Sequence, residues 1–296
     1  METFFALPHP QLYLLCLAAA FLLCAALLLR KAPHQRAAAG CFVALALLLG
    51  AFFARFLFLI VKTSDLAMTA QWFFAPEDVR EFAFSGAVLG VIAALWASQK
   101  LFKTDALWDA AAVPCMLMVL IARLAEIFVP FGVGDYVEAP ALWWVPLCMP
   151  DGFGSWLLSI FLFEALWALF SLVYVKKQKA HRFFSAVLCY HVGQMFFESL
   201  RSETLRYGFV RVSQVIAACV LFILLCVMGR GQKGFVRRVL ITLLCIALYV
   251  GFEFGLDRLP WPHIILRTAM VATSAVLFYT IRGDAHGQTP EERTTP

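Results

Sequence analysis

Residues 12–31 read LYLLCLAAAFLLCAALLLRK, an apolar run closed by two basic residues. A helix needs about 20 apolar residues to cross the roughly 30 Å of hydrocarbon in a bilayer, and this run has that length. Of the 296 residues in the chain, 62% are hydrophobic and 15% are charged, and the mean hydropathy is +0.83. A soluble domain needs more charged surface than this, so the composition predicts an integral membrane protein.

Similar apolar runs recur along the whole chain. Lipid offers the backbone no hydrogen-bond partners, so each spanning segment is expected to be a helix. The predicted fold is an all-α, polytopic membrane helical bundle of about nine transmembrane helices, at residues 10–29, 38–61, 82–99, 107–129, 154–175, 183–200, 209–228, 238–256 and 262–281.

The basic residues predict how these spans are oriented. Fifteen of the 24 lysines and arginines fall in one set of alternate loops or in the tail, at positions 30, 31, 36, 100, 103, 176, 177, 179, 182, 230, 233, 237, 238, 282 and 293. The opposite loops carry acids instead. The positive-inside rule therefore predicts that the N-terminus lies outside and the C-terminus in the cytoplasm. The net charge of +5 reflects this topology, and no nucleic-acid partner is expected.

Motifs of soluble enzymes are missing from the sequence. It contains no glycine-rich phosphate loop, no HExxH and no GxSxG, and its nine cysteines form no CxxC pair. We therefore expect neither a metal nor an organic cofactor. The last residues, 284–296, have the composition of a disordered tail.

The informative residues are ionisable groups within the predicted spans, where each charge costs about 2.5–3.5 kcal/mol near the bilayer centre. They are Arg55, Arg123, Glu126, Glu164, Glu198 and Arg201. One interpretation is that these charges only pair with one another and hold helices together. The other is that they line a polar cavity.

Spacing favours the cavity in two places. Arg123 and Glu126 are three residues apart and share one face of a helix. His191, Gln194, Glu198 and Arg201 form a polar stripe at helical spacing on an otherwise apolar segment. Guanidinium groups bind phosphate bidentately, and the anion available at this depth is a phospholipid head group. These residues predict an arginine-bearing cavity open to the outer leaflet.

Several stretches occur in a recognisable order: the span at 12–31 with Tyr13, GAFFARFLF around Arg55, FAFSGAVLGVIAALWASQK at 82–100, ALWDAAAVPCMLMVLIARLAEIF at 106–128, LFEALW at 162–167, and FFESLRSE at 196–203 followed by Gln214. In this order they resemble the prolipoprotein diacylglyceryl transferase family over roughly residues 10–228. Arg123 aligns with the arginine of the family signature GRxGNFxNGE. Arg55 aligns with that of a GGRxGY-like stretch, and FFESLRSE with the family's EFFRxPD.

The chain departs from the family pattern at named positions. Ser85 stands where the family has the histidine of FHGG, and Glu126 where the signature has asparagine. The signature's NGE becomes Val129, Pro130 and Phe131, and Gln194 replaces an arginine upstream of EFFR. The HPxQLYE stretch is absent. The arginines match the family pattern better than the residues that would position or deprotonate the acceptor.

The resemblance implies a transferase that moves the diacylglyceryl group of phosphatidylglycerol to the lipobox cysteine of a preprolipoprotein, at the outer leaflet of the bacterial plasma membrane. The implied partners are phosphatidylglycerol or another anionic phospholipid, membrane lipid, and the preprolipoprotein signal peptide. The expected catalytic residues are Glu126 as base, Arg123 and Arg201 on the phosphate, and Glu198 orienting Arg201. The expected substrate-binding residues are Tyr13, Arg55, Ser85, Gln194 and Gln214.

The resemblance also predicts the domain organisation: a diacylglyceryl-transferase-like seven-span core at 1–230, two additional transmembrane helices at 231–283, and the tail. Two other functions stay open. The chain could be a diverged phospholipid-binding relative with another acceptor or no catalysis. It could also be a transporter or membrane scaffold, for which an inverted repeat would be the expected signature, and the sequence shows none.

Overall fold

The computed structural model describes residues 8–63, 65–129, 132–208, 210–232, 234–258 and 263–282. The chain divides into two compact units, one formed by residues 1–186 and 200–215 and the other by residues 187–199 and 216–296. The predicted tail, 284–296, lies outside the described residues.

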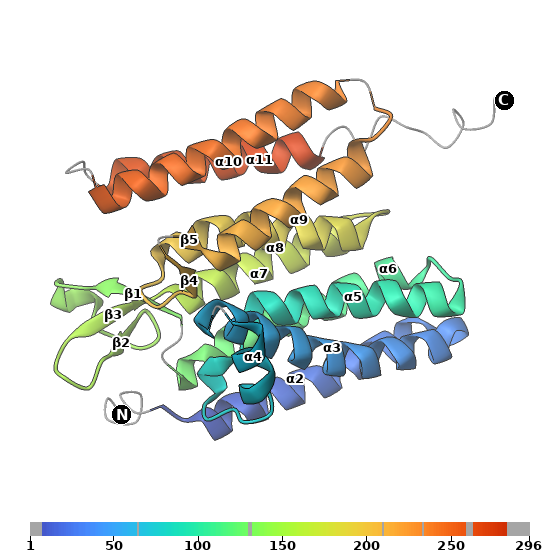
Figure 1. The fold of residues 1–296 in the computed structure, drawn as a ribbon, viewed down its shortest axis with the longest axis horizontal. Coiled ribbons are helices and arrows are strands. Elements are labelled where there is room, and N and C mark those ends of the chain that lie inside the picture. Colours follow the sequence, from blue (N-terminus) through green and yellow to red (C-terminus); the bar gives the residue numbers. More distant parts are fainter. Residues whose placement is uncertain are drawn as a thin grey trace. The chain divides into compact units, whose positions relative to one another are not determined.

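Helices make up most of the first unit. They are α2 (Pro10–Lys31), α3 (Arg36–Thr63), α4 (Leu66–Trp72), α5 (Phe84–Phe102), α6 (Leu107–Ala125) and α7 (Ile160–Lys177), with 3-10 turns at η1 (Pro33–Gln35), η2 (Val79–Glu81), η3 (Glu126–Phe128) and η4 (Pro140–Leu142). Helix α3 packs on α5, while α6 packs on both α2 and α7. Figure 1 shows α3 and α5 side by side.

Small residues allow α3 and α5 to approach closely. A Cβ atom added to Gly86 would lie 2.4 Å from the carbonyl oxygen of Phe53, and one added to Gly90 would lie 2.3 Å from that of Leu49. Two glycines one helical turn apart are typical of close helix contacts in membranes, where apolar side chains gain little by leaving lipid. This contact fixes α5, which carries Ser85 and Phe84.

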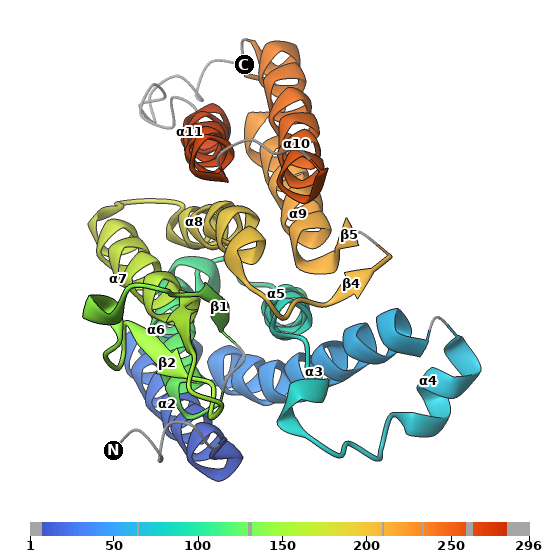
Figure 2. The same ribbon diagram turned by 90° about the vertical axis from the view of Figure 1, so that its left-hand side faces the viewer.

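A small antiparallel sheet lies between α6 and α7 in the sequence. Its strands are β1 (Val133–Tyr136), β2 (Cys148–Pro150) and β3 (Trp156–Ser159), in the spatial order β1–β3–β2. Strands β2 and β3 form a hairpin closed by Asp151, whose Oδ1 accepts hydrogen bonds from the backbone N–H groups of Phe153 and Ser155. Figure 2 shows these strands against the end of the helices.

This hairpin corrects the predicted span at 154–175. Residues 156–159 pair with β2 in an extended conformation, so the helix begins only at Ile160. The sequence predicts no strand here, because the apolar residues of β3 continue directly into those of α7.

Two helices pass from one unit into the other: α8 (Arg182–Phe197), followed by η5 (Glu198–Leu200), and α9 (Val212–Gly229). The short strands β4 (Arg206–Tyr207) and β5 (Val210–Arg211) lie between them in the chain. The predicted span 183–200 corresponds to α8 and η5 together, with the last turn, from Glu198, in the 3-10 conformation. Ser202 turns away to bond the Val133 carbonyl through both its backbone N–H and its hydroxyl.

The second unit contains α10 (Phe235–Arg258) and α11 (His263–Arg282), which pack against each other. The Tyr249 hydroxyl donates to the carbonyl oxygen of Met270 at 3.0 Å and hydrogen-bonds the Ser274 hydroxyl. Hydrogen bonds between helices are a usual way of holding membrane helices together.

Seven helical segments among the described residues are long and apolar enough to cross a membrane: 10–31, 33–63, 84–102, 107–128, 212–229, 235–256 and 263–282. Large apolar side chains such as Leu15, Leu22 and Ile223 are exposed on them, as lipid-facing residues would be. A polytopic helical membrane protein is thus confirmed. The count of nine spans and the orientation stay predictions; α7 and α8, the predicted fifth and sixth spans, are 18 and 16 residues long.

Candidate active site

Four buried charged residues of the first unit form one cluster, which we call the quartet: Arg123, Glu126, Glu164 and Arg201. Arg123 pairs with Glu126, and its Nε lies 3.1 Å from Glu164 Oε2. Arg201 donates to Glu164 through Nε (3.2 Å) and Nη2, and to Glu126 Oε2 through Nη2 (3.0 Å). Each guanidinium group therefore contacts both carboxylates.

Three separate parts of the chain supply these side chains. Arg123 lies in the last turn of α6, and Glu126 opens η3 immediately after it. Glu164 lies near the start of α7, which follows the sheet. Arg201 comes just after η5 and is held in place because the next residue, Ser202, is hydrogen-bonded to β1. The sheet thus positions two of the three parts.

Burial makes these charges interdependent. The side chains of Arg123 and Glu126 are 3% exposed, that of Glu164 5% and that of Arg201 10%. An isolated buried charge costs several kcal/mol, and only close pairing with good hydrogen bonds offsets that cost. The guanidinium carbon of Arg123 also lies 4.1 Å from the ring centre of Phe84, a cation–π contact.

Glycine permits the close packing around Glu126. A Cβ atom at Gly132 would lie 2.2 Å from Glu126 Oε2 and 2.6 Å from Cβ of Phe161, so no larger residue fits without displacing the carboxylate. Tyr13 of α2 packs with Ala125 and Val129, which precede and follow η3 in the chain. The structure therefore brings together four predicted site residues, Tyr13, Arg123, Glu126 and Arg201.

Glu164 was recognised in the sequence as an intramembrane charge but received no role. In the structure Glu164 binds both arginines, as Glu126 does. The signal was available in LFEALW, a carboxylate in an otherwise apolar stretch. Its partners could not be predicted, because Arg201 lies 37 residues away in the chain.

Arg55 makes its described contacts elsewhere, with the segment between α4 and α5. Its guanidinium pairs with the Glu81 carboxylate and donates to backbone carbonyls of Trp72 (2.7 Å), Phe73 (3.3 Å) and Ala75 (3.3 Å). These contacts favour the structural role for Arg55 over lipid binding.

The remaining predicted residues are dispersed. The Ser85 hydroxyl of α5 lies 3.4 Å from that of Ser213, and Gln214 is half-buried in the first turn of α9. In the second unit Gln194 donates to Glu198 Oε2 at 2.9 Å, and His191 Nδ1 bonds the Val187 carbonyl at 2.9 Å. The predicted stripe does not continue on one α-helix, because Glu198 lies in η5 and Arg201 beyond it. The orienting role of Glu198 stays a prediction.

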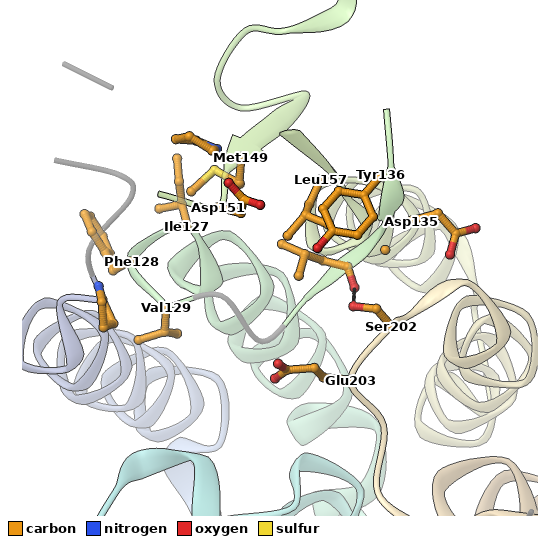
Figure 3. A pocket seen from close by; sticks show the side chains of 14 residues that line it. Ile127, Phe128, Val129, Asp135, Tyr136, Met149, Asp151, Leu157, Ser202 and Glu203 are labelled. Carbon is orange, nitrogen blue, oxygen red and sulfur yellow. Dashed lines mark hydrogen bonds between the residues drawn. The ribbon is translucent and has the colours of Figure 1, made fainter. Parts of the chain in front are cut away.

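A cavity of about 460 Å³ lies beside the quartet in the same unit. Its walls come from residues 127–129, which follow Glu126, from the sheet, and from Ser202 and Glu203, which follow Arg201 (Figure 3).

The structure offers neither a reactive cysteine at this cavity nor a metal site among the described residues. Cys148 directly precedes Met149 of the cavity wall, and burial raises the pKa of its thiol, so this cysteine is a poor nucleophile near neutral pH. Among the described residues no group of three or more His, Cys, Asp or Glu side chains could hold a metal ion.

Comparison with known proteins gives the family. Two curated proteins of Clostridium kluyveri strains, each named phosphatidylglycerol–prolipoprotein diacylglyceryl transferase, are 30% identical to this chain over 148 residues. The match covers 46% of this chain and 57% of each relative, so the chain spans little more than half the length of these proteins. No solved structure shows a significant match. The family model of prolipoprotein diacylglyceryl transferase matches residues 3–230, and the chain belongs to this family.

Proposed function

We propose that this chain is a membrane transferase that moves the diacylglyceryl group of phosphatidylglycerol to the cysteine of a prolipoprotein, at the outer leaflet of the plasma membrane. The names of the two relatives supply the donor and the acceptor. The alignment of Arg123 with the signature arginine and the long apolar helices support the assignment.

The observation that carries the proposal is the convergence of Arg123 and Arg201. They come from distant parts of the chain, yet both guanidinium groups contact Glu164 and Glu126 in one buried cluster. A guanidinium group carries five N–H donors in one plane, so it can bind a carboxylate along one edge and a phosphate along another. Two such groups in one cluster suit the binding of a lipid phosphate.

The reaction then follows from the chemistry of the two substrates. The sulfur of the acceptor thiolate attacks the glycerol carbon of the diacylglyceryl group that bears the phosphate ester. A C–S bond forms and the C–O bond breaks, and the electron pair leaves with glycerol phosphate. Arg123 and Arg201 stabilise the charge that develops on this phosphate. Stabilisation of developing charge by fixed donors is usually the largest single contribution to the rate of an enzymatic reaction.

The thiol proton must be accepted by a group of the protein, and Glu126 is our candidate. Ser85 stands where the family has histidine, and a hydroxyl accepts no proton near neutral pH. Tyr13 and Gln214 are proposed to contact the head group. Glu164 holds the two arginines at a fixed separation.

The test is transfer with purified protein. The full chain in vesicles is incubated with phosphatidylglycerol labelled in its acyl chains and with a lipobox peptide containing one cysteine. We expect label on the peptide, a mass increase of one diacylglyceryl group, and release of glycerol phosphate. A cysteine-to-serine peptide serves as the control. Absence of transfer with several acceptor peptides would overturn the proposed reaction.

One observation favours the second candidate, a phospholipid-binding relative without catalysis. Both arginines of the quartet are already paired with carboxylates, as they would be in a structural ion-pair network. This alternative predicts phosphatidylglycerol binding that depends on Arg123 and Arg201, with no labelled peptide under any condition.

A further inference from the structure

The cavity beside the quartet is graded from apolar to acidic. Its inner surface is formed by buried side chains, among them Val129, Val133 and Met149. The exposed Asp135 and Glu203 and the half-buried Asp151 also line the cavity, and Figure 3 shows the Asp151 and Glu203 side chains extending from different segments of the wall. Among the described residues that line it, three are acids and none is basic.

The residues that line the cavity determine which kind of ligand it can bind. A volume of about 460 Å³ falls within the range of about 300–1,000 Å³ that is usual for ligand sites. The apolar inner surface excludes a strongly hydrated ion. The exposed carboxylates of Asp135 and Glu203 repel an anionic head group and attract a cation by simple complementarity. The cavity therefore suits a ligand with an apolar part and a positive charge, unlike the phosphate proposed for the arginines.

The cavity and the quartet share their backbone. Ile127 in the cavity wall directly follows Glu126, and Ser202 directly follows Arg201, so each wall residue lies about 3.8 Å along the chain from a charged residue of the quartet. The two hydrogen bonds from Ser202 to the Val133 carbonyl hold this wall against β1. A polypeptide with its cysteine at the quartet reaches the cavity within a few residues.

We propose that this cavity binds the acceptor polypeptide just beyond its cysteine, with an apolar side chain at the inner surface and a basic side chain at the acidic opening. The inference rests on the proposed function for the position of the cysteine. It assigns to Glu203 and Asp135 the recognition of the basic side chain.

Peptide binding tests the inference without requiring catalysis. The full chain is placed in phosphatidylcholine nanodiscs, whose neutral surface does not itself attract cations. Three fluorescent peptides share a lipobox and continue after the cysteine with Ile-Lys-Ile-Lys, Ile-Glu-Ile-Glu or Ser-Lys-Ser-Lys. Anisotropy should show the first binding about tenfold more tightly than either of the others, the sum of a few modest contacts. Equal affinity for the basic and acidic peptides would overturn the proposal.

Matched variants locate the effect. Glu203→Gln and Asp135→Asn should each weaken binding of the Ile-Lys-Ile-Lys peptide about threefold and reduce its salt dependence. Glu138→Gln is the control, because Glu138 is an exposed acid that follows β1 and does not line the cavity. If Glu138→Gln has the same effect as Glu203→Gln, general surface charge and not the cavity is responsible.

The outcome also separates the inference from the proposed function. Equal affinity for all three peptides, together with equal lipid transfer to them in phosphatidylglycerol vesicles, would contradict the inference and leave the transferase proposal intact. Selective binding of the basic peptide with no lipid transfer to any of them would uphold the acceptor site and contradict the transferase proposal.

Discussion

Two guanidinium groups and two carboxylates balance one another in the quartet, and no single member can be removed without consequence. Deleting one partner of a buried ion pair leaves the other uncompensated and typically costs about 3–5 kcal/mol of stability. Any variant of these residues therefore needs a folding measurement beside its functional one.

The arginines are expected to determine phospholipid binding. Arg123→Ala and Arg201→Ala should each weaken binding of phosphatidylglycerol by about tenfold or more, since charge-assisted hydrogen bonds contribute about 1.5–3 kcal/mol each. Lysine at either position should not restore full binding, because a compact ammonium group cannot bind a carboxylate and a phosphate along two separate edges as guanidinium does. Titration of labelled phosphatidylglycerol onto the protein in phosphatidylcholine nanodiscs measures the affinity, and Arg238→Ala serves as the unaffected control. The same affinity in all variants would contradict an anion site at the quartet.

Glu126 distinguishes catalysis from pairing. If it accepts the thiol proton, Glu126→Gln should abolish transfer while phosphatidylglycerol binding stays within a few-fold of the parent. Adding Ser85→His to that variant should restore part of the transfer. If Glu126 only pairs with the arginines, the same change should loosen lipid binding or lower the unfolding temperature. Transfer by Glu126→Gln at the parental rate would show that the base is another group.

At the scale of elements, the segment between α4 and α5 depends on one side chain of α3. Arg55 satisfies carbonyl groups of Trp72, Phe73 and Ala75 and pairs with Glu81. Arg55→Gln should therefore release this segment, lowering stability by about 3–5 kcal/mol and making residues 73–81 sensitive to limited proteolysis.

A nearby surface pair provides the matched control for Arg55. Arg80 lies 3.7 Å from Asp78 in the same segment, and both side chains are more than 40% exposed. Exposed pairs contribute only about 0–1 kcal/mol, so Arg80→Gln should leave the cleavage pattern unchanged. If Arg55→Gln is as resistant to the protease as the parent, Arg55 does not hold this segment in place.

The elements also show what hydropathy can predict. Spans such as 10–29 and 38–61 agree with α2 and α3 within about two residues, because lipid exposure selects long apolar runs whatever packs beside them. The sheet escaped prediction because β1 to β3 are short and end directly in α7. The contact of Arg123 with Glu126 followed from helical spacing. Their contacts with Glu164 and Arg201 depend on how distant segments fold back, which no local pattern records.

At the scale of the whole molecule, the family match ends at residue 230, and α10 and α11 follow it. These helices hold each other through Tyr249, Met270 and Ser274. A chain that ends after Arg230 should therefore still insert and retain the lipid activity of the full protein. Transfer and phosphatidylglycerol binding of the truncated chain, normalised to folded protein, provide the measurement. A well-folded but inactive truncation would assign the two helices to the site.

The sequence order of the quartet has a consequence for biogenesis. Ribosomes deliver the chain from its N-terminus, so Arg123 and Glu126 enter the bilayer together, as opposite charges one helical turn apart. Glu164 follows alone, and Arg201 emerges 37 residues later. Until then the nascent chain holds one more carboxylate than guanidinium group of the quartet. We therefore expect the segment that bears Glu164 to reach its final position only after Arg201 has been translated and has left the ribosome.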